Sequence, residues 1–405
     1  MRVAGIIAEY NPFHAGHAWH IAQTRAVGQI HAAGITHVVA VMSGYAVQRG
    51  EFAIARKQVR AQMALENGVD LVLCLPAPFS CARAQDFARA GVHLLQSLGC
   101  VDILSFGSEC GDVSLIQRAA SGLREEGVKN FMRAMVGEGS AFAAARQAAL
   151  ARLDPEAGAL LRSPNDTLGV EYLTAMEELG ADFAPLAIPR RGAGHDLPGG
   201  EGFPCASELR IIFLERGILP ENFPSSAILR DEAASGLAPV DMRRLETAWL
   251  ARLRRMDIAD LLHLPDISEG MEHLLFNAIH KGRTVEEILS FAGGRRYPTA
   301  RLRRVLFHAL VGATAQDLVA LPHFIQVIGF SAAGQELLRR MKTTASLPIV
   351  LRHRDIKALS AEAQRQYAIE CRAADLMALA TPKVQPCGME ERSEVTIYYV
   401  KTPTQ

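Results

Sequence analysis

The alternation of apolar and helical segments near the N-terminus is the feature that most constrains how this chain folds. Up to about residue 115, short apolar runs occur at residues 3–8, 36–42, 69–75 and 101–106. Segments with helical spacing separate them, at residues 17–33, 53–67 and 87–98. Continuously apolar strands between helices are typical of a parallel sheet covered on both faces. We therefore expect a doubly wound α/β fold, which binds ligands beyond the carboxyl ends of its strands.

The rest of the chain becomes more helical. Residues 187–190 are expected to form an edge strand of the same sheet. After about Asp231, strand-like runs are rare, and helical periodicity continues to about Leu379. A chain of 405 residues has room for two or three domains. We expect an α/β catalytic domain at residues 1–230 and a second, mainly α-helical domain at residues 231–405.

Composition excludes several classes of protein. Lys+Arg and Asp+Glu both number 43, so the whole chain carries no nucleic-acid signal and any basic patch is local. No run approaches the roughly 18 apolar residues of a membrane span, and the N-terminus does not resemble a signal peptide. The 7 cysteines include no CxxC pair. We therefore expect a cytoplasmic protein with reduced thiols and no protein-bound metal site.

A histidine-rich turn is the strongest candidate for chemistry. Directly after the first apolar run, the chain reads Tyr10-Asn11-Pro12-Phe13-His14-Ala15-Gly16-His17, and a helix begins there. Free backbone N–H groups and the dipole at a helix N-terminus favour a polyphosphate. Two imidazoles donate hydrogen bonds to phosphate oxygens, and Gly16 removes a side chain where a nucleotide must approach closely. The alternative is an ordinary polar loop, but its place after the first strand favours phosphate binding.

This turn opens a longer resemblance to a known family. The chain is similar to the tRNA(Met) cytidine acetate ligases, members of the HxGH nucleotidyltransferase superfamily. Besides residues 5–17, the resemblance rests on Met42-Ser43-Gly44, Val47-Gln48-Arg49-Gly50-Glu51, Asn67-Gly68-Val69-Asp70-Leu71-Val72, Phe106-Gly107-Ser108-Glu109, Ser163-Pro164-Asn165-Asp166-Thr167-Leu168-Gly169-Val170-Glu171-Tyr172, Ile188-Pro189-Arg190, Arg296-Tyr297, the run Arg301 to Leu306, and Val327-Ile328-Gly329-Phe330. These segments keep their order along nearly the whole chain.

The resemblance implies two reactions. Acetate attacks the α-phosphate of ATP, bound as Mg-ATP, and gives acetyl-adenylate and pyrophosphate. The exocyclic amine (N4) of the wobble cytidine of elongator tRNA(Met) then takes the acetyl group. Nucleotidyl transfer needs charge stabilisation on the α-phosphate and the leaving pyrophosphate, which histidines supply without a protein nucleophile.

The resemblance also implies a set of site residues. His14 and His17 are the expected catalytic residues. The expected ATP-binding residues are Ile7, Ala8, Glu9, Tyr10, Asn11, Pro12, Phe13, His14, Ala15, Gly16, His17, Ala18, Trp19, His20, Gly107, Asn165, Arg190, Ser207 and Arg210. Arg190 offers a fixed fork of donors for phosphate. Each outlying position has a plainer alternative: Gly107 as a turn, Asn165 as a helix cap, and Arg190 as part of a surface ion pair.

Arginines of the second half are the candidate RNA-binding face. They are Arg243, Arg244, Arg252, Arg254, Arg255, Arg295, Arg296, Arg301, Arg303 and Arg304, of which the last five are the expected RNA-binding residues. Tyr297 would add a stacking surface for a base. Acidic residues are interspersed, so a solvated helix face is the alternative.

Three positions depart from the family pattern, and other functions stay open. Tyr45, Cys74 and Arg83 replace the usual residues close to the expected acetate or cytidine pocket. His195 and Asp196 are candidates for deprotonating the attacking amine, although a plain surface loop is favoured there. The alternative functions are a small-molecule adenylyl- or cytidylyltransferase and a nucleotide-regulated RNA-binding protein. The oligomeric state is not predicted.

Overall fold

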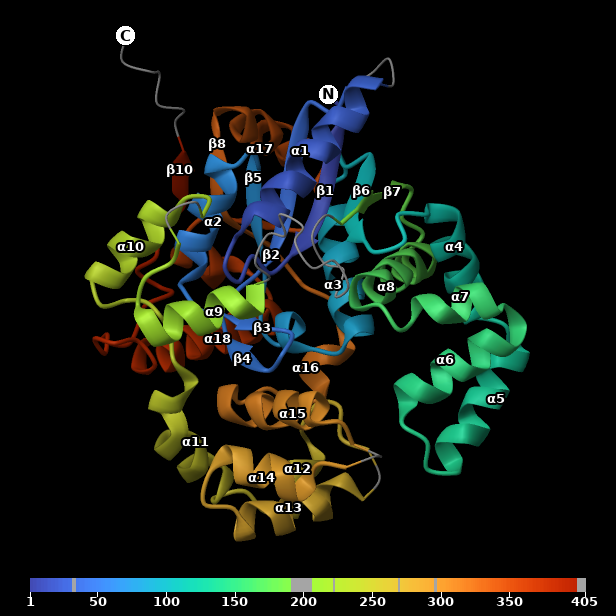
Figure 1. Cartoon of the computed structure of the whole chain (residues 1–405). Coiled ribbons are helices and arrows are strands. Elements are labelled where there is room, and N and C mark those ends of the chain that lie inside the picture. The colour runs from blue at the N-terminus through green and yellow to red at the C-terminus, as the bar shows by residue number, and fades with distance from the viewer. Residues whose placement is uncertain (31–33, 191–205, 221–222, 269, 295–296, 399–405) are drawn as a thin grey trace.

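The computed structural model describes residues 1–30, 34–190, 206–220, 223–268, 270–294 and 297–398. Its centre is a twisted sheet with helices on both sides, and a group of helices extends below one edge of that sheet (Figure 1). Within the described residues, no helix is both long and apolar enough to span a bilayer.

The central sheet joins strands from both halves of the chain. Its strands are β1 (Val3–Ala8), β2 (His37–Ser43), β5 (Leu71–Leu75), β6 (Ile103–Ser108), β7 (Ala184–Pro189), β8 (Ile325–Ser331), β9 (Ile349–Val350) and β10 (Thr396–Tyr398). Their order is β10-β8-β5-β2-β1-β6-β7, and β9 pairs with β8. The pairs from β5 to β7 are all parallel, so the predicted strands and the edge position of residues 187–190 are confirmed.

The prediction of a wholly parallel sheet needs one correction. β8 lies antiparallel to β5, so the sheet is mixed. Residues 327–330, which we placed in the helical half, belong to this strand. Their apolar run is short, and such a run does not by itself distinguish a strand from a piece of buried helix.

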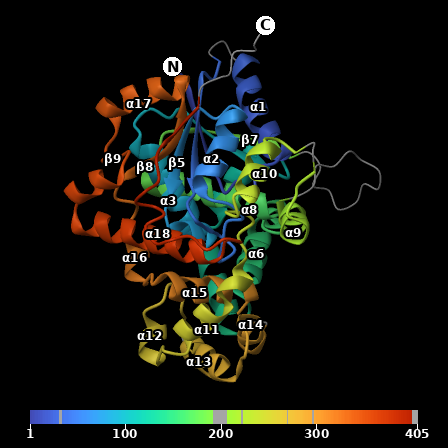
Figure 2. The ribbon, with the colours of Figure 1, turned by 90° about the vertical axis from the view of Figure 1, so that its left-hand side faces the viewer.

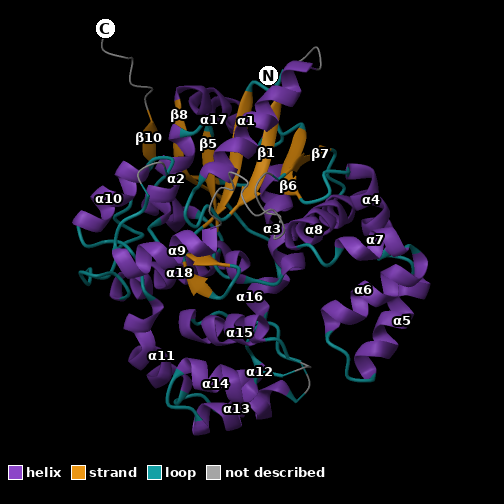
Figure 3. Ribbon diagram, in the orientation of Figure 1, coloured by secondary structure: helices purple, strands orange, loops and turns teal. Residues whose placement is uncertain are grey.

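Helices cover the two faces of the sheet as a doubly wound fold requires (Figures 2 and 3). One face packs against α3 (Ala84–Ser97), α4 (Val113–Gly122), α8 (Pro164–Leu179) and α17 (Ala332–Thr344). The other packs against α1 (Ala15–Ile30), α2 (Lys57–Glu66), α9 (Ala206–Arg216) and α10 (Ser226–Ala234). Both faces are therefore dry, and ligand access is left to the strand ends.

A helical arm extends from the face that contains α4 and α8. It consists of α5 (Glu126–Gly137), α6 (Phe142–Leu153) and α7 (Pro155–Leu160). Arg146 of α6 forms an ion pair with the buried Glu171 of α8 and anchors the arm. Glu171 also accepts a hydrogen bond from Gln85 of α3 (3.1 Å).

The main group of helices lies beyond the carboxyl edge of the sheet. It contains η2 (Met242–Leu245), α11 (Glu246–Leu253), α12 (Ile258–Leu262), α13 (Met271–Lys281), α14 (Val285–Ala292), α15 (Thr299–Val311) and α16 (Gln316–Val319). The chain continues through η3 (His353–Ala358) and α18 (Ala361–Leu379).

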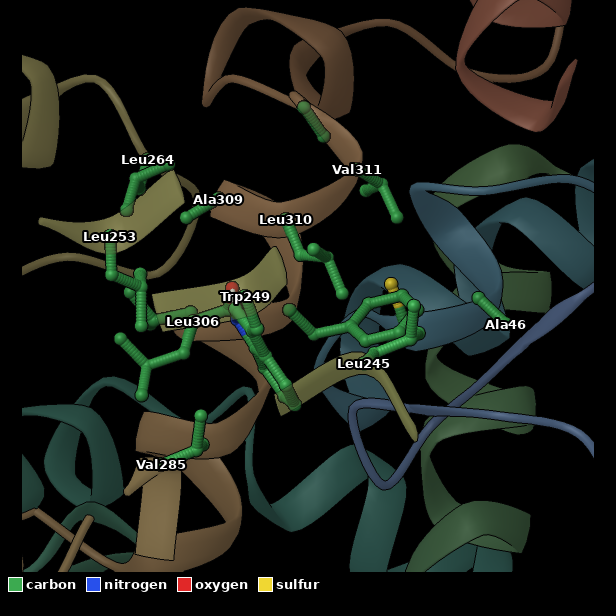
Figure 4. Packing of buried hydrophobic residues seen from close by; sticks show 14 of the residues in the cluster. Ala46, Leu245, Trp249, Leu253, Leu264, Val285, Leu306, Ala309, Leu310 and Val311 are labelled. Atoms are coloured by element: carbon green, nitrogen blue, oxygen red, sulfur yellow. Dashed lines mark hydrogen bonds between the residues drawn. The ribbon is translucent and has the colours of Figure 1, made fainter. Parts of the chain in front are cut away.

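These helices share a core with an early hairpin, β3 (Ala46–Val47) and β4 (Glu51–Phe52). Figure 4 shows Ala46 in the same cluster as Trp249 and Leu306. The Trp249 indole N–H donates to the backbone carbonyl of Leu306 (2.9 Å) and ties α11 to α15. Because residues 325–398 return to the sheet, the predicted division at residue 230 does not coincide with the end of the sheet.

Candidate functional site

The loop after β1 is held by its own backbone and by two neighbouring segments. Tyr10 has a φ of 48°, a left-handed conformation that turns the chain out of the strand. The Asn11 side chain accepts a hydrogen bond through Oδ1 from the Ile54 N–H (2.7 Å). Arg210 of α9 donates to the Asn11 backbone carbonyl (2.8 Å). The loop is thus fixed against the segment that follows β4 and against α9 before α1 begins at Ala15.

The two histidines of the turn lie against each other at the start of α1. Their rings stack with centroids 3.8 Å apart. The Gly16 N–H donates to His14 Nδ1 (3.0 Å), and the His14 N–H donates to His17 Nδ1 (3.2 Å). A backbone N–H only donates, so each Nδ1 accepts. In the neutral ring the hydrogen then lies on Nε2, and each histidine keeps one ring N–H donor.

The surroundings of these rings keep them neutral. Burial, with a smaller contribution from the Arg190 charge, lowers the pKa of His14 to about 4. Burial places the pKa of His17 well below its usual range, with smaller contributions from His14, His20 and Arg190. Burial likewise lowers the pKa of His20 to about 4. His20 Nε2 lies 2.9 Å from the Ser105 hydroxyl of β6, which ties α1 to the sheet.

Gly16 is required by this arrangement. A Cβ at Gly16 would lie 2.8 Å from Cε1 and 3.0 Å from Nδ1 of His14. Any side chain there would displace the His14 ring from the Gly16 N–H. The glycine of the motif therefore positions His14, in addition to leaving room for a ligand.

Arg190 and Gly107 lie side by side at the ends of β7 and β6. A Cβ on Gly107 would touch the Arg190 side chain at 3.6 Å. Arg190 is exposed, and no carboxylate of the described residues forms an ion pair with it. The alternative reading of Arg190 as part of a surface ion pair therefore has no support from this part of the chain. The Arg190 charge contributes to the lowered pKa values of His14, His17 and His20.

Asn165 lies at the start of α8, but it is not the cap of that helix. Ser163 occupies the cap position. The Asn165 amide donates to Glu109 Oε1 (2.5 Å), and Glu109 Oε2 accepts from the Asp166 N–H (2.9 Å). Asp166 in turn accepts from the Ser108 hydroxyl (2.5 Å). The loop after β6 and the start of α8 therefore form one polar unit.

Ser207 and Arg210 occupy the first turn of α9, as expected from their spacing. Arg210 donates to the Ser207 hydroxyl (3.2 Å) and lies 3.8 Å from Glu51 of β4. Since Arg210 also donates to the Asn11 carbonyl, the structure brings this pair to the histidine turn.

Several buried polar atoms around the turn have no partner within the described residues. They are the Tyr10 hydroxyl, Asn11 Nδ2 and Gln48 Nε2. Asn11 is only 3% exposed. Buried donors are nearly always hydrogen-bonded, so unpartnered ones at a strand edge indicate a ligand site. Donors of this kind fit the oxygens of a polyphosphate.

The other expected ATP-binding residues follow the chain through this region. Ile7 and Ala8 end β1, Pro12 and Phe13 lie in the loop, and Ala15, Ala18 and Trp19 belong to the first turns of α1. No group of three or more His, Cys, Asp or Glu side chains within the described residues is arranged to hold a metal ion.

A buried ion cluster beside the site was missed by sequence reasoning. Lys57 lies 2.9 Å from Glu390 and 3.3 Å from Glu370, and all three side chains are almost fully buried. Glu370 also accepts from the backbone N–H groups of Tyr45 (3.2 Å) and Ala77 (2.8 Å). The cluster fixes the loops that follow β2 and β5. No local pattern signals it, because Lys57 is more than 300 residues away from both glutamates.

Of the three residues that depart from the family pattern, Tyr45 and Cys74 lie at this cluster and Arg83 lies nearer the surface. The Tyr45 hydroxyl donates to Glu390 (2.7 Å), and the Cys74 thiol lies 3.6 Å from Lys57 Nζ. Burial raises the pKa of both groups well above their usual ranges. Arg83 instead forms a more exposed ion pair with Asp86 (2.7 Å).

The expected RNA-binding arginines are largely engaged within the protein. Arg301 and Arg304 of α15 lie 3.1 and 3.6 Å from Asp266, and Arg303 lies 2.8 Å from Glu286. Arg295 and Arg296 lie outside the described residues, as do His195 and Asp196. Tyr297 is buried at 7% exposure, so little of its ring is left to stack on a base.

The fold and the histidine turn together define a class of protein, the nucleotidyltransferases of the HIGH type. The model of the family "HIGH Nucleotidyl Transferase" matches residues 1–392. The tRNA(Met) cytidine acetate ligase of Thermoanaerobacter sp. is 35% identical over 86% of this chain and 88% of its own length. That of Acetivibrio thermocellus is 32% identical over 98% of this chain and 100% of its own.

A solved structure agrees with these relatives. Thermotoga maritima TmcAL, bound with alpha-thio ATP, superposes with a TM-score of 0.90 at 28% identity, over 98% of this chain and all of that one. The chain belongs to the HIGH nucleotidyl transferase family and, within it, to the tRNA(Met) cytidine acetate ligases.

Proposed function

We propose that this protein is an ATP-dependent tRNA cytidine acetate ligase. The observation that carries the proposal is the neutral, stacked histidine pair at the start of α1, with both Nδ1 atoms accepting and both Nε2 atoms free to donate. Donors fixed in advance at a helix N-terminus stabilise charge that develops on a phosphate. In the first reaction an acetate oxygen attacks the α-phosphorus of ATP, and pyrophosphate leaves.

The residues of the turn divide this work between them. His14 and His17 donate to the reacting phosphate, and Gly16 holds the His14 ring in place. Arg190, which has no ion-pair partner among the described residues, lies beside them and neutralises phosphate charge, while Gly107 and Asn165 border the nucleoside. Ser207 and Arg210 hold the β and γ phosphates at the first turn of α9. Magnesium accompanies the phosphates of ATP.

In the second reaction the acetyl group passes to N4 of the wobble cytidine of elongator tRNA(Met). The relatives at 32% and 35% identity are named for this tRNA and this product, which supports the same substrate here. We assign catalysis to residues 1–230 and tRNA binding mainly to residues 231–405, with Arg295, Arg296, Arg301, Arg303 and Arg304 as contacts. A reaction on tRNA places the enzyme in the cytoplasm.

The decisive test is acetate-dependent ATP–pyrophosphate exchange by the purified protein without tRNA. A second incubation adds a tRNA pool, and its nucleosides are analysed by mass spectrometry. Exchange that requires acetate, together with acetylcytidine in tRNA, is the expected result. Exchange without any need for acetate would point to a small-molecule adenylyltransferase. Absence of exchange would leave a nucleotide-regulated RNA-binding protein.

A further inference from the structure

Glu9 lies beside the histidine turn, and its carboxylate takes no part in the contacts of the two histidines. It is the first residue beyond β1, at the carboxyl edge of the sheet. Its side chain is largely enclosed, but part of it remains accessible to solvent. Such sheets bind their substrates beyond the carboxyl ends of the strands, so Glu9 lies at the edge where a ligand is expected.

The protein fixes one side of this carboxylate and leaves the other side open. Glu9 Oε1 accepts a hydrogen bond from the Gln48 N–H of the β3–β4 hairpin (2.7 Å). Arg60 of α2 donates to the Glu9 backbone carbonyl (2.6 Å), which holds the main chain. No donor within the described residues is recorded for Oε2. The open oxygen therefore has room to accept a hydrogen bond from a ligand.

Charged groups face Glu9 from several elements. Arg210 of α9 and Arg60 of α2 favour the carboxylate, and Glu51 of β4 opposes it. On α8, burial is the main cause that raises the pKa of Tyr172, and the Glu9 charge adds to it. For Glu9 itself, burial is the largest influence and raises the pKa, while the Gln48 N–H and the two arginines act against it.

The second reaction needs a proton acceptor. The N4 lone pair of cytidine is delocalised into the ring, so the amine attacks a carbonyl effectively only as it loses a proton. The histidines of the turn do not suit this task, because each Nδ1 accepts a backbone hydrogen bond and each Nε2 carries a hydrogen. A base within hydrogen-bond reach of the amine is therefore required from elsewhere.

We propose that Glu9 is the general base for acetyl transfer, with its open Oε2 accepting one N4 proton of the cytidine. N4 forms a bond to the acetyl carbon, the bond between that carbon and the phosphate oxygen breaks, and AMP leaves with the electron pair. The proton passes from N4 to Glu9 and then to solvent. This inference rests on the proposed function, because it names a residue for its second reaction.

The test separates the two reactions in the variant Glu9→Gln. The first is measured as acetate-dependent ATP–pyrophosphate exchange without tRNA. The second is measured as transfer to tRNA from added acetyl-adenylate. Because Glu9 is also among the expected ATP-binding residues, we expect some loss of exchange, and a loss of transfer that exceeds it by about 10²- to 10⁴-fold, the usual contribution of a positioned base. Glu9→Asp should recover part of the transfer.

The pH profile gives a readout that a merely structural role would not move. Wild-type transfer should decline as the pH falls through the raised pKa of Glu9, because the protonated carboxyl accepts no proton. The Glu9→Gln variant should lack this acid limb. As a matched control, Glu232→Gln alters another buried carboxylate, which is bound by Arg56, and should leave the ratio of the two rates unchanged.

The outcomes that overturn the inference differ from those that overturn the function. Equal losses of exchange and transfer would show that Glu9 serves only ATP binding, and full transfer in Glu9→Gln would exclude it as the base. A wild-type protein without acetate-dependent exchange would instead overturn the proposed function, and this inference with it. Circular dichroism of each variant excludes unfolding as the cause of a loss.

Discussion

Two polar regions lie near each other beyond the same edge of the sheet, and they differ in how their hydrogen bonds are satisfied. In the Lys57 cluster, the buried ammonium and both carboxylates find partners within the protein. In the histidine turn, Asn11 Nδ2, Gln48 Nε2 and the Tyr10 hydroxyl find none among the described residues. Burial alone therefore does not distinguish scaffold from site.

The difference follows from the cost of burying polar groups. A buried charge without a partner is strongly unfavourable, so a cluster that only supports the fold must be complete in itself. In a binding site, by contrast, some donors have no partner within the protein and are available to the ligand. Arg60 shows the first case, because its guanidinium donates to the carbonyls of Ala55, Glu9 and Gly44 and leaves little for a ligand. Burial lowers the pKa of this arginine to about 10.

The largest expected effect comes from removing the cation of the Lys57 cluster. Lys57→Met leaves Glu370 and Glu390 buried without their cation, which should lower the free energy of unfolding by about 3–5 kcal/mol. Urea unfolding without ligand measures this loss. Lys129→Met, at a half-exposed surface pair, should stay within about 0.5 kcal/mol of the wild type. A loss below about 1 kcal/mol for Lys57→Met would contradict the role given to the cluster.

Removing a donor from the histidine turn should lower the activity far more than the stability. His17→Ala should lower acetate-dependent exchange by about 10²- to 10³-fold, because one donor to the reacting phosphate is lost. The fold should be kept, although the thermal unfolding midpoint should fall somewhat, because the ring also accepts the His14 N–H and packs against Tyr10 and Phe13. His93→Ala, which removes a contact to the Pro322 carbonyl, serves as the control and should keep exchange. Normal exchange by His17→Ala would sink the assignment of the turn.

Acid should weaken the histidine turn. His14 titrates near pH 4 in the folded protein and near 6.5 when unfolded. Between these values the unfolded chain binds more protons, so stability falls as the pH drops from about 6.5 toward 4. His14→Gln should remove about 2 kcal/mol of the stability lost between pH 7 and 5. Urea titrations of both proteins at the two pH values measure this, and identical losses would refute it.

The smallest expected effects concern the arginines of the helical part. Arg255 is exposed, and no ion pair holds it within the described residues, whereas Arg303 is bound by Glu286. Arg255→Ala should therefore weaken tRNA binding by about threefold and lower the salt slope by about 1. Arg303→Ala should have a smaller effect on both. Filter binding across a salt series tests this order, and the reverse order would show that Arg303 leaves Glu286 to meet the tRNA.

The sequence was most informative where structure is local. The strands at 3–8, 36–42, 69–75 and 101–106 followed from apolar runs, and the helix that begins at Ala15 followed from the turn before it. Periodicity and turn chemistry act over a few residues, so one stretch of chain suffices to read them. The sequence placed Arg210 and Asn11 in the same expected ATP site, but it did not predict the hydrogen bond from Arg210 to the Asn11 carbonyl.

Long-range features were beyond this kind of reasoning. The antiparallel pairing of β8 with β5 joins Leu71 to Phe330, and Lys57 meets Glu370 and Glu390 from two later segments. Such contacts depend on how the whole chain packs. The arginines of α15 illustrate the same limit, because the sequence does not show that Asp266 and Glu286 face them.

The placement of β8 has a consequence for the order in which this protein matures during synthesis. β5 and the early strands leave the ribosome long before residues 325–331, which complete the sheet beside β5. Until then, the fully apolar β5 presents an unpaired edge, a template for association with other chains. A chain terminated before residue 325 would keep that edge permanently. Nascent and truncated forms of this protein should therefore depend on chaperones much more than the finished chain does.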